Sequence, residues 1–442
     1  MTEQKRQEKN KAIGAARKAT SEKRLSQECH TYLCKIQHNR LATRQKESIY
    51  MSFVEEKWIY NDAINWLNED PDHKLKDYCI PDTILHYDKD KNPVLTELKY
   101  AHSQVKQQVI TKISSSLKSL NRLKAKGHKV GKLRFISDVK VAHYPQCSKT
   151  MKQLKFRNNQ YVKIPGIPGN VRVNGLDQFV NIPGIEIACF ELIKRPDGLF
   201  IAFTTYCPKR QKQHTKKGTI GIDFGCSNSF TMSDGSTKDF KVEETDRLKR
   251  LQKKLSYKQG YKKGEKKSNK FKKLSRAIER EYQKMTNKKQ ALANEFVHNI
   301  CEYEHVVIQD ENLTEWHKTH GVAVQHSILG RVKSKLIEEP NVTVLNKYAP
   351  TTQLCTNCMK KHTEMKDLSN RIFKCDCGVE EDRDIHAAKT MVWMYEHNIG
   401  VGRTESNEFG FKLCFDQTDS SYKYILTDVD KELAAKREDS TL

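Results

Sequence analysis

The sequence lacks the long apolar runs that a membrane protein needs. No run approaches the roughly 18 apolar residues of a spanning helix, and no apolar signal region follows Met1. Acidic residues are scarce relative to basic ones: 55 Asp and Glu stand against 79 Lys and Arg among 442 residues, a formal net charge of +24. We therefore expect a soluble, cytoplasmic, nucleoid-associated protein with two or three domains and no membrane partner.

The excess positive charge is concentrated in one segment. Residues 241–290 contain 19 Lys or Arg against 6 Asp or Glu, which is +13 of the net charge. A charge run is usually a solvated helix face. This density exceeds what solubility needs and favours a groove for nucleic acid, because each neutralised phosphate releases a counterion. The candidate contacts in this segment are Lys253, Lys254, Lys262, Lys263, Lys272 and Lys273.

Thirteen cysteines could suggest disulfides, but in so large a chain the clustering of four of them fits reduced thiols better. These four follow a C-x2-C then C-x-C pattern: Cys355, Cys358, Cys375 and Cys377. Ligand type and spacing are those of a structural Zn2+ site, whereas four buried thiols seldom arise at such regular spacing. A second, irregular group is a weaker zinc candidate: Cys29, His30, Cys34 and His38.

Periodicity and turn residues divide the first half of the chain. Apolar residues recur at helical spacing over residues 53–66 and 104–126, and the second helix is predicted to end near Gly127. Between residues 130 and 206, Pro-Gly pairs separate short β-branched runs. This pattern predicts a small β domain, a barrel.

The second half is predicted to be mixed α/β. Strands over residues 219–223 and 229–232 and a third strand after the Asp234-Gly235 turn form a meander. Later strands and helices then alternate. They are the strands 305–309 and 342–346 and the helices 322–338 and 383–397, the last with Ala387, Ala388, Met391 and Met394 facing inward. This order describes a ribonuclease-H-like sheet.

Three acids stand at the ends of these elements. Asp223 ends the first strand, Glu311 follows the fourth with Asp310 as its rival, and Asp384 opens the last helix. Taken one at a time, Asp223 could be a turn residue, Glu311 an ordinary loop residue and Asp384 the N-cap of a helix. In the predicted topology the first and fourth strands are neighbours and the last helix starts beside their ends, so the three carboxylates converge. Two Mg2+ or Mn2+ ions would offset their repulsion and support phosphodiester hydrolysis.

Several motifs, in this order, resemble the split RuvC domain of TnpB transposon nucleases and miniature type V CRISPR effectors. They are GIDFG at residues 221–225, ENL at 311–313, the cysteine quartet and DRDIHAA at 382–388. Three upstream segments also resemble recurring TnpB segments: FVEEKWIYN at 53–61, KGHKVGKL at 126–133 and VRVNGL at 171–176. The resemblance covers about residues 50 to 400.

The resemblance implies an RNA-guided DNA endonuclease that holds a guide RNA, recognises a short flanking motif and cuts double-stranded DNA. Asp223, Glu311 and Asp384 would be its catalytic residues and would bind Mg2+, and the zinc module would guide substrate to them. The helical lobe would contact nucleic acid through Lys57, Gln104 and Gln107. The two glutamines are the candidates for base-edge contacts, because amides can pair with adenine. A monomer or a homodimer would assemble on one RNA.

The implied organisation has seven parts. They are a basic N-terminal extension, helical or disordered (1–50), a helical recognition lobe (51–129), a β-barrel wedge domain (130–217), a first nuclease part (218–349), a zinc-binding target nucleic-acid module (350–379), a second nuclease part (380–400) and an acidic C-terminal tail (401–442).

Two departures from the family pattern leave alternatives open. His386 stands where the family usually has Asn, and Gln309 stands where its middle acid commonly follows the strand. Asp310 therefore remains an alternative to Glu311. An RNA-guided, repressor-like DNA-binding protein without cleavage remains an alternative function, and a transposon or CRISPR origin is equally open.

Overall fold

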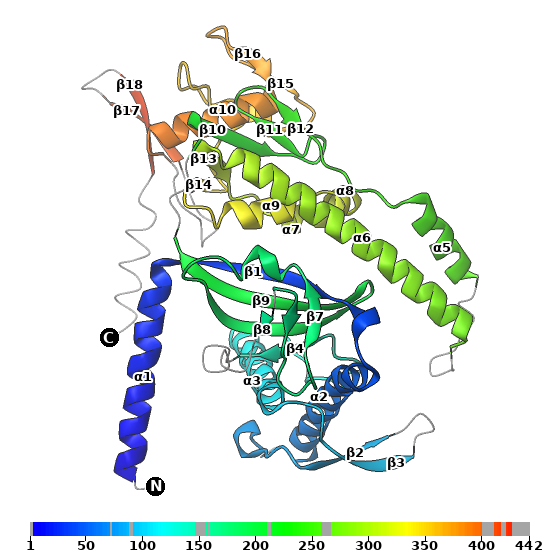
Figure 1. Cartoon of the computed structure of the whole chain (residues 1–442). Helices are drawn as coiled ribbons and strands as arrows, with labels where there is room; N and C mark the ends of the chain where they lie inside the picture. The colour runs from blue at the N-terminus through cyan, green and yellow to red at the C-terminus, as the bar shows by residue number, and fades with distance from the viewer. Residues whose placement is uncertain are drawn as a thin grey trace. The chain divides into compact units, whose positions relative to one another are not determined.

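The chain divides into two compact units, Met1–Gln211 and Lys212–Leu442 (Figure 1). The computed structural model describes residues 3–70, 73–87, 92–145, 156–157, 159–209, 214–257, 267–399, 411–416 and 421–426. In these residues no helix combines the length and the apolar character needed to cross a membrane. The predicted boundary between residues 217 and 218 falls within a strand of the second unit, and the remaining domain limits stay predictions.

The first unit is built on a seven-stranded sheet with the order β4-β8-β9-β1-β7-β6-β5. All its neighbouring strands are antiparallel. The strands are β1 (Gln27–Ile36), β4 (Val141–Tyr144), β5 (Phe156–Arg157), β6 (Tyr161–Val162), β7 (Val171–Asn174), β8 (Glu186–Arg195) and β9 (Gly198–Pro208). Among the described strands β4 and β5 do not pair with each other, so closure into a barrel stays a prediction.

The N-terminal segment differs from the expected helical or disordered extension. Helix α1 (Glu3–Leu25) is followed by β1, which pairs with β9 along one edge and β7 along the other. Only Cys34 and Ile36 of this strand are buried. The other positions need not be apolar, and the sequence therefore lacks the regular alternation that would have predicted a strand. Pairing with strands more than a hundred residues away decides its structure, which local sequence cannot reveal.

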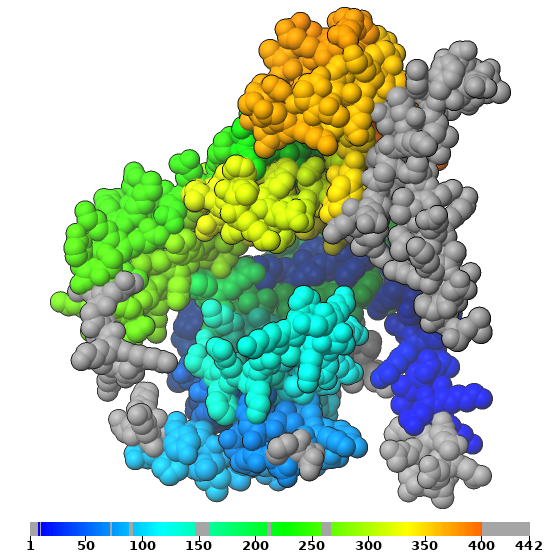
Figure 2. Space-filling view, turned by 180° about the vertical axis from the view of Figure 1, so that it is seen from behind, coloured from blue at the N-terminus to red at the C-terminus, as the bar shows by residue number. Residues whose placement is uncertain are grey.

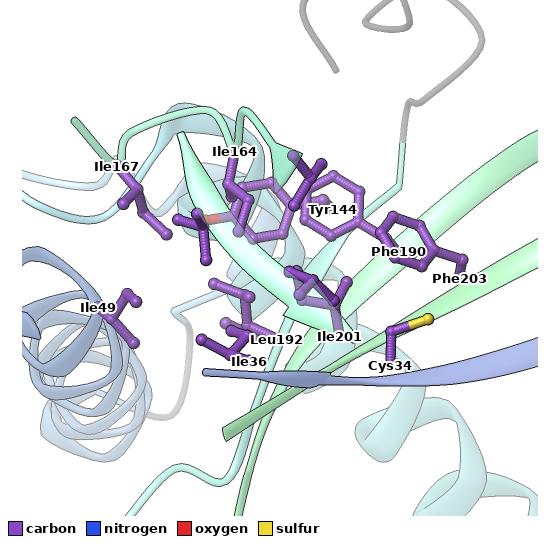
Figure 3. Packing of buried hydrophobic residues seen from close by; sticks show 14 of the residues in the cluster. Cys34, Ile36, Ile49, Tyr144, Ile164, Ile167, Phe190, Leu192, Ile201 and Phe203 are labelled. Carbon is purple, nitrogen blue, oxygen red and sulfur yellow. The ribbon is translucent and has the colours of Figure 1, made fainter. Parts of the chain in front are cut away.

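Aromatic side chains fill the core of this unit (Figure 3). The rings of Tyr144 and Phe190 stack with centroids 4.4 Å apart, and Phe203 packs beside them. Ile49, from a helix, and Ile36, from β1, close the same cluster. The sheet is therefore anchored to the helical part of its unit through one shared core.

That helical part contains α2 (Thr43–Glu69), α3 (Ser103–Ala125) and the hairpin of β2 (Thr83–Tyr87) and β3 (Pro93–Glu97). The prediction for residues 104–126 is confirmed to within one residue at each end. The helix ends near Gly127 as predicted, and this glycine adopts a left-handed conformation. The helix predicted over 53–66 lies inside α2, which starts ten residues earlier. Short 3-10 turns are η1 (His38–Arg40), η2 (Leu75–Asp77) and η3 (Leu176–Gln178).

Two adjacent buried glutamates of α2 have opposite environments. The Glu55 carboxylate accepts hydrogen bonds from the backbone N–H groups of Lys99, Tyr100 and Ala101, at 2.6–3.0 Å. Glu56 is 6% exposed, and its Oε2 has no hydrogen-bond partner among the described residues. Burial raises the pKa of Glu56 to about 8, although Lys112 partly offsets it. The fold therefore favours the protonated form of Glu56.

We predict that Glu56→Gln stabilises the first unit and Glu55→Gln destabilises it. Because the folded-state pKa of Glu56 is raised, the fold loses stability as pH rises from its ordinary pKa through 8, and the amide removes that loss. Melting temperatures of the variants at pH 5 and pH 8 test this. A change of 1 kcal/mol in the free energy of unfolding shifts the melting temperature by roughly 2–4 °C. If Glu56→Gln raised the melting temperature as much at pH 5 as at pH 8, the assignment of a raised pKa to Glu56 would be contradicted.

The second unit contains the predicted sheet. Its strands are β10 (Lys216–Phe224), β11 (Phe230–Met232), β12 (Thr237–Lys238), β13 (Tyr303–Gln309) and β14 (Val342–Leu345), in the order β12-β11-β10-β13-β14. The first three form an antiparallel meander, and β13 runs parallel to both β10 and β14. The prediction that the first and fourth strands are neighbours is confirmed.

Helices cover both faces of this sheet. They are α5 (Asp246–Ser256), α6 (Asn269–Ile300), α7 (Leu313–Thr319), α8 (Gly321–His326), α9 (Leu329–Leu336) and α10 (Arg383–Glu396). Val306 and Ile308 of β13 pack in the cluster that includes α6 and α9, whereas Val307 packs with Met391 and Met394 of α10. Alternate residues of one strand thus face different helical layers.

The prediction of a single helix over residues 322–338 is wrong. α8 ends at His326 and α9 begins at Leu329. Ser327 between them is extended, its hydroxyl donates to the Val324 carbonyl at 2.8 Å, and the same oxygen accepts from the N–H of Leu329. A serine side chain that bonds to nearby backbone competes with helix continuation, and this explains the break.

The remaining elements are small. η4 (Thr363–Lys366), β15 (Ile372–Lys374) and β16 (Glu380–Asp382) form a module between β14 and α10. Most of the predicted acidic tail, residues 401–442, lies outside the described residues. Within it, β17 (Phe411–Asp416) and β18 (Ser421–Leu426) pair as an antiparallel hairpin.

Candidate functional site

Helix α10 lies unusually close to strand β10. A Cβ atom added to Gly221 would stand 2.1 Å from the carbonyl oxygen of Ala388 and 3.1 Å from a methyl group of Val392. Ala387 and Ala388 are fully buried, as the sequence predicted. Small residues on both sides therefore permit the contact, which brings the start of α10 near the end of β10.

Asp223 stands at that end of β10 and is partly buried. Burial raises the pKa of Asp223 well above its usual range, and the negative charges of Asp384 and Glu311 raise it further, while Arg383 lowers it. Charges that shift the pKa of a carboxyl group lie close to it. The structure thus brings the three predicted acids into one electrostatic neighbourhood.

Glu311 and Asp310 follow β13 but differ in their partners. The Nζ atom of Lys333 lies 2.8 Å from Oδ1 of Asp310 and also donates to the backbone carbonyl of Glu311. Burial raises the pKa of Glu311 to about 7, with Lys333 lowering it and Asp310 raising it. Asp310 is thus held in an ion pair, and it is Glu311 whose charge acts on Asp223.

Gln309, which stands where the family commonly has its acid, is a structural residue. Its buried side-chain amide donates to the carbonyls of Asn346, Lys347 and Ala349, and its oxygen accepts from the hydroxyl of Thr351. All its polar atoms are used to hold the loop after β14. Gln309 therefore does not take the place of an acid in the group of Asp223, Glu311 and Asp384.

Asp382, not Asp384, caps α10. Oδ1 of Asp382 accepts hydrogen bonds from the N–H groups of Asp384 at 2.9 Å and of Ile385 at 3.2 Å. The N-cap role considered for Asp384 is therefore filled by another residue. The Asp384 carboxylate instead meets Arg383, whose Nη2 lies 3.4 Å from Oδ1.

Arg383 supplies a buried positive charge beside the acids. Its side chain is almost fully buried, and its Nε and Nη1 atoms have no hydrogen-bond partner among the described residues. Buried donors are seldom left unpaired, because removing them from water has a cost that a hydrogen bond normally offsets. The positive charge of Arg383 lowers the pKa of Asp223 and so offsets part of the repulsion among the acids.

The three carboxylates form an open group. Among the described residues, the only sets of three or more metal-type donors with all atoms within 4.8 Å of one another are the cysteine quartet and Glu28, His30 and Cys207. The acids thus lie farther apart than the donors of one tight ion cage. Hard oxygen donors nevertheless fit Mg2+ or Mn2+, whose charge would offset the repulsion of the carboxylates, and two ions can bridge a wider set.

The cysteine quartet is assembled in the small module. Sγ of Cys355 lies 3.5 Å from Sγ of Cys377, and Sγ of Cys358 lies 3.4 Å from Sγ of Cys375. Four sulfurs around Zn2+ at 2.3 Å would be about 3.8 Å apart, so the donor set fits. The pKa of the Cys377 thiol is lowered by a backbone hydrogen bond from Val379, whereas burial raises the pKa values of Cys355 and Cys375, so the zinc assignment rests on the positions of the four sulfurs.

His386 links this module to α10. Nδ1 lies 2.8 Å from Oε1 of Glu381, Nε2 lies 2.8 Å from the carbonyl of Leu354, and the ring stacks on Phe373 at 3.6 Å. The side chain is buried against the module. Its difference from the family pattern therefore has a structural explanation.

The candidate nucleic-acid contacts are distributed over both units. Lys253 and Lys254 of α5 and Lys272 and Lys273 of α6 are exposed. α5 and the first turns of α6 extend away from the sheet of their unit (Figures 1 and 2). Lys262 and Lys263 lie outside the described residues. In the first unit, Lys57 and Gln104 are partly buried on α2 and α3, and Gln107 is exposed.

A ribonuclease-H-like sheet with an inserted cysteine module defines the class of the second unit, and family models agree. Residues 202–315 match the model described as probable transposase, OrfB_IS605. Residues 331–391 match the model described as Cas12f1-like, TNB domain. The resemblance to TnpB-like miniature type V effectors is confirmed over these residues.

More distant comparisons add little. No curated protein matches the chain. A solved structure, described as the cryo-EM structure of the Cas12f1-sgRNA-target DNA complex, is similar with a TM-score of 0.44 and 11% sequence identity, over 83% of this chain and 99% of that chain. At this distance the likeness carries no argument.

We predict that removing zinc from the full chain unfolds the module between β14 and α10. Structural zinc contributes about 10–16 kcal/mol in small modules, more than so small a core can supply. Cys358→Ser should therefore abolish amide-exchange protection in β15 and β16 while β10 and β13 stay protected. Cys79→Ser, at an exposed thiol of the other unit, is the control. Full protection in Cys358→Ser would rule out the zinc site.

Proposed function

We propose that the protein is an RNA-guided DNA endonuclease whose active site consists of Asp223, Glu311 and Asp384. The observation that carries the proposal is geometric: Asp223 lies near the end of β10, Glu311 follows the neighbouring parallel strand β13, and Asp384 lies in the first turn of α10. Helix α10 packs directly on β10. The raised pKa of Asp223, to which burial and the other two carboxylates contribute, agrees with this arrangement. Buried acids that repel one another cluster at functional sites, because a structural role would favour pairing them with cations. The match to the transposase and Cas12f1-like models supports the same reaction class.

The chain's own residues would have distinct roles in phosphodiester hydrolysis. The three carboxylates would hold the cations, and Lys333 would fix the turn that carries Glu311 through its bonds to Asp310 and the Glu311 carbonyl. Bound Mg2+ or Mn2+ would supply an activated water and charge for the leaving oxygen. Arg383 would offset part of the negative charge of the acids, through its contact with Asp384 and its lowering of the pKa of Asp223.

Recognition would be divided between base pairing and the protein. A guide RNA would select the DNA sequence, and the exposed lysines of α5 and α6 would neutralise phosphates without reading bases. Gln104 and Gln107 of α3 would read a short flanking motif. The zinc module would guide the DNA strand toward the acids.

Cleavage is favoured over the repressor-like alternative. That alternative was motivated by His386 and Gln309, and both side chains are engaged in structural hydrogen bonds outside the acid cluster. Neither departure removes one of the three acids. A protein that only bound DNA would have no need of three carboxylates that destabilise one another.

We predict that Asp223→Ala lowers Mg2+-dependent cleavage of guide-matched DNA by roughly 10³-fold or more while the affinity for guide RNA is unchanged. The loss follows because the remaining acids cannot hold the cations alone. Cleavage of labelled DNA by the purified protein with its co-expressed RNA measures the effect, and filter binding measures the RNA affinity.

Two further variants make this test specific. Glu311→Gln should reduce cleavage as strongly as Asp223→Ala, whereas Asp310→Asn, one residue away, should retain most of it because Asp310 is paired with Lys333. Glu295→Gln, at an exposed acid of α6, is the control for charge alone. Undiminished cutting by Asp223→Ala would refute the active-site assignment.

A further inference from the structure

The first unit contains a mixed set of metal-type donors that the nuclease proposal does not use. The donor atoms of Glu28, His30 and Cys207 all lie within 4.8 Å of one another. Glu28 of β1 is directly opposite Cys207 of β9, and His30 pairs with Thr205 two positions along. Residues two apart on a strand share a face, so the sheet register itself brings the three side chains together.

The local packing fixes two of these donors. Thr205 is fully buried and donates its hydroxyl to the His30 carbonyl at 3.0 Å, which holds the strand segment that carries the imidazole. Cys207 is 4% exposed yet lies outside the hydrophobic clusters of the described residues. By strand alternation Cys207 shares its face of the sheet with Glu28 and His30, and farther along that face lies Phe203 of the core. The thiol is thus buried beside the polar pair, at the end of the core-facing side.

The distance between the imidazole and the carboxylate suits a shared cation. Nε2 of His30 lies 3.1 Å from Oε2 of Glu28. Ligand atoms bound at 2.0–2.3 Å around a tetrahedral ion are about 3.3–3.8 Å apart, so a small opening of this pair would admit one. The His30 side chain is half exposed, which leaves a path for the ion and a fourth position for water.

We propose that Glu28, His30 and Cys207 form a second transition-metal site that binds a borderline divalent cation of the Zn2+ class. One thiolate, one imidazole and one carboxylate are the donor types that such ions accept, and three protein ligands leave an open coordination position. The ion would join the N-terminal strand β1 to β9. This site is independent of the nuclease activity.

The set differs from the one that the sequence suggested. Strand alternation places Cys29 on the opposite face of β1 from His30. Cys34 donates its thiol to the Gly175 carbonyl within the core, and His38 begins a separate 3-10 turn. Only His30 of that group belongs to the site. Its partners are Glu28, two residues earlier on β1, and Cys207 of the distant strand β9.

Zinc content of the full chain tests the proposal. The purified protein is equilibrated with excess Zn2+, freed of unbound ion and measured by mass spectrometry of the metal. We expect one equivalent fewer in Cys207→Ser and in His30→Ala than in the unmodified chain. Cys29→Ser is the matched control, because its thiol is adjacent in sequence but faces the other way, and it should lose nothing.

A variant of the quartet separates the two sites. Cys358→Ser should lower the zinc content of the chain through the cysteine quartet. Adding Cys207→Ser to this variant should remove a further equivalent of zinc. Co2+ bound to the Cys358→Ser chain should show a near-ultraviolet thiolate-to-cobalt band that loses the contribution of one thiolate when Cys207→Ser is added and is unchanged by Cys29→Ser. His30→Ala changes a half-exposed side chain and so gives an answer even if Cys207→Ser fails to fold. Equal zinc in the unmodified chain, Cys207→Ser and His30→Ala would overturn the proposal.

Discussion

The approach of α10 to β10 at Gly221 is the constraint on which the acid cluster depends. Any side chain at this position would collide with the backbone of Ala388, so the helix could not lie where it does. The same contact brings Asp384 near Asp223. β10 and β13 are parallel with Ile222 beside Ile308, so Glu311 follows the same edge of the sheet. Packing of uncharged residues thus assembles the charged ones.

The cluster itself opposes folding. Burial raises the pKa values of Asp223 and Glu311, and the charges of Asp384 and Glu311 raise that of Asp223 further, which means that the ionised forms are destabilised in the folded chain. Arg383 offsets part of this charge, and Lys333 compensates Asp310. The remaining imbalance is what divalent cations would neutralise. Carboxyl groups with pKa values raised by burial and by neighbouring charge are common at functional sites.

Local sequence signals predicted the elements whose structure is decided locally. The Asp234-Gly235 turn and the strands around it fixed the meander, α3 followed from its apolar spacing, and the cysteine quartet followed from its ligand spacing. Features that depend on distant partners were not predictable. Glu28 and His30 meet Cys207 across about 180 residues, and β1 is a strand because of β9. The pairing of Lys333 with Asp310, which favours Glu311, also required the fold.

The most direct test of the central claim, that three carboxylates act as one cation site, is thermal melting of the chain and of Asp223→Asn with and without Mn2+. Without Mn2+ or Mg2+, Asp223→Asn should melt at a higher temperature, because it removes a buried and repelled charge. Added Mn2+ should stabilise the unmodified chain and leave the variant nearly unchanged, which reverses their order. Equal stabilisation of both proteins by Mn2+, or of neither, would contradict the account.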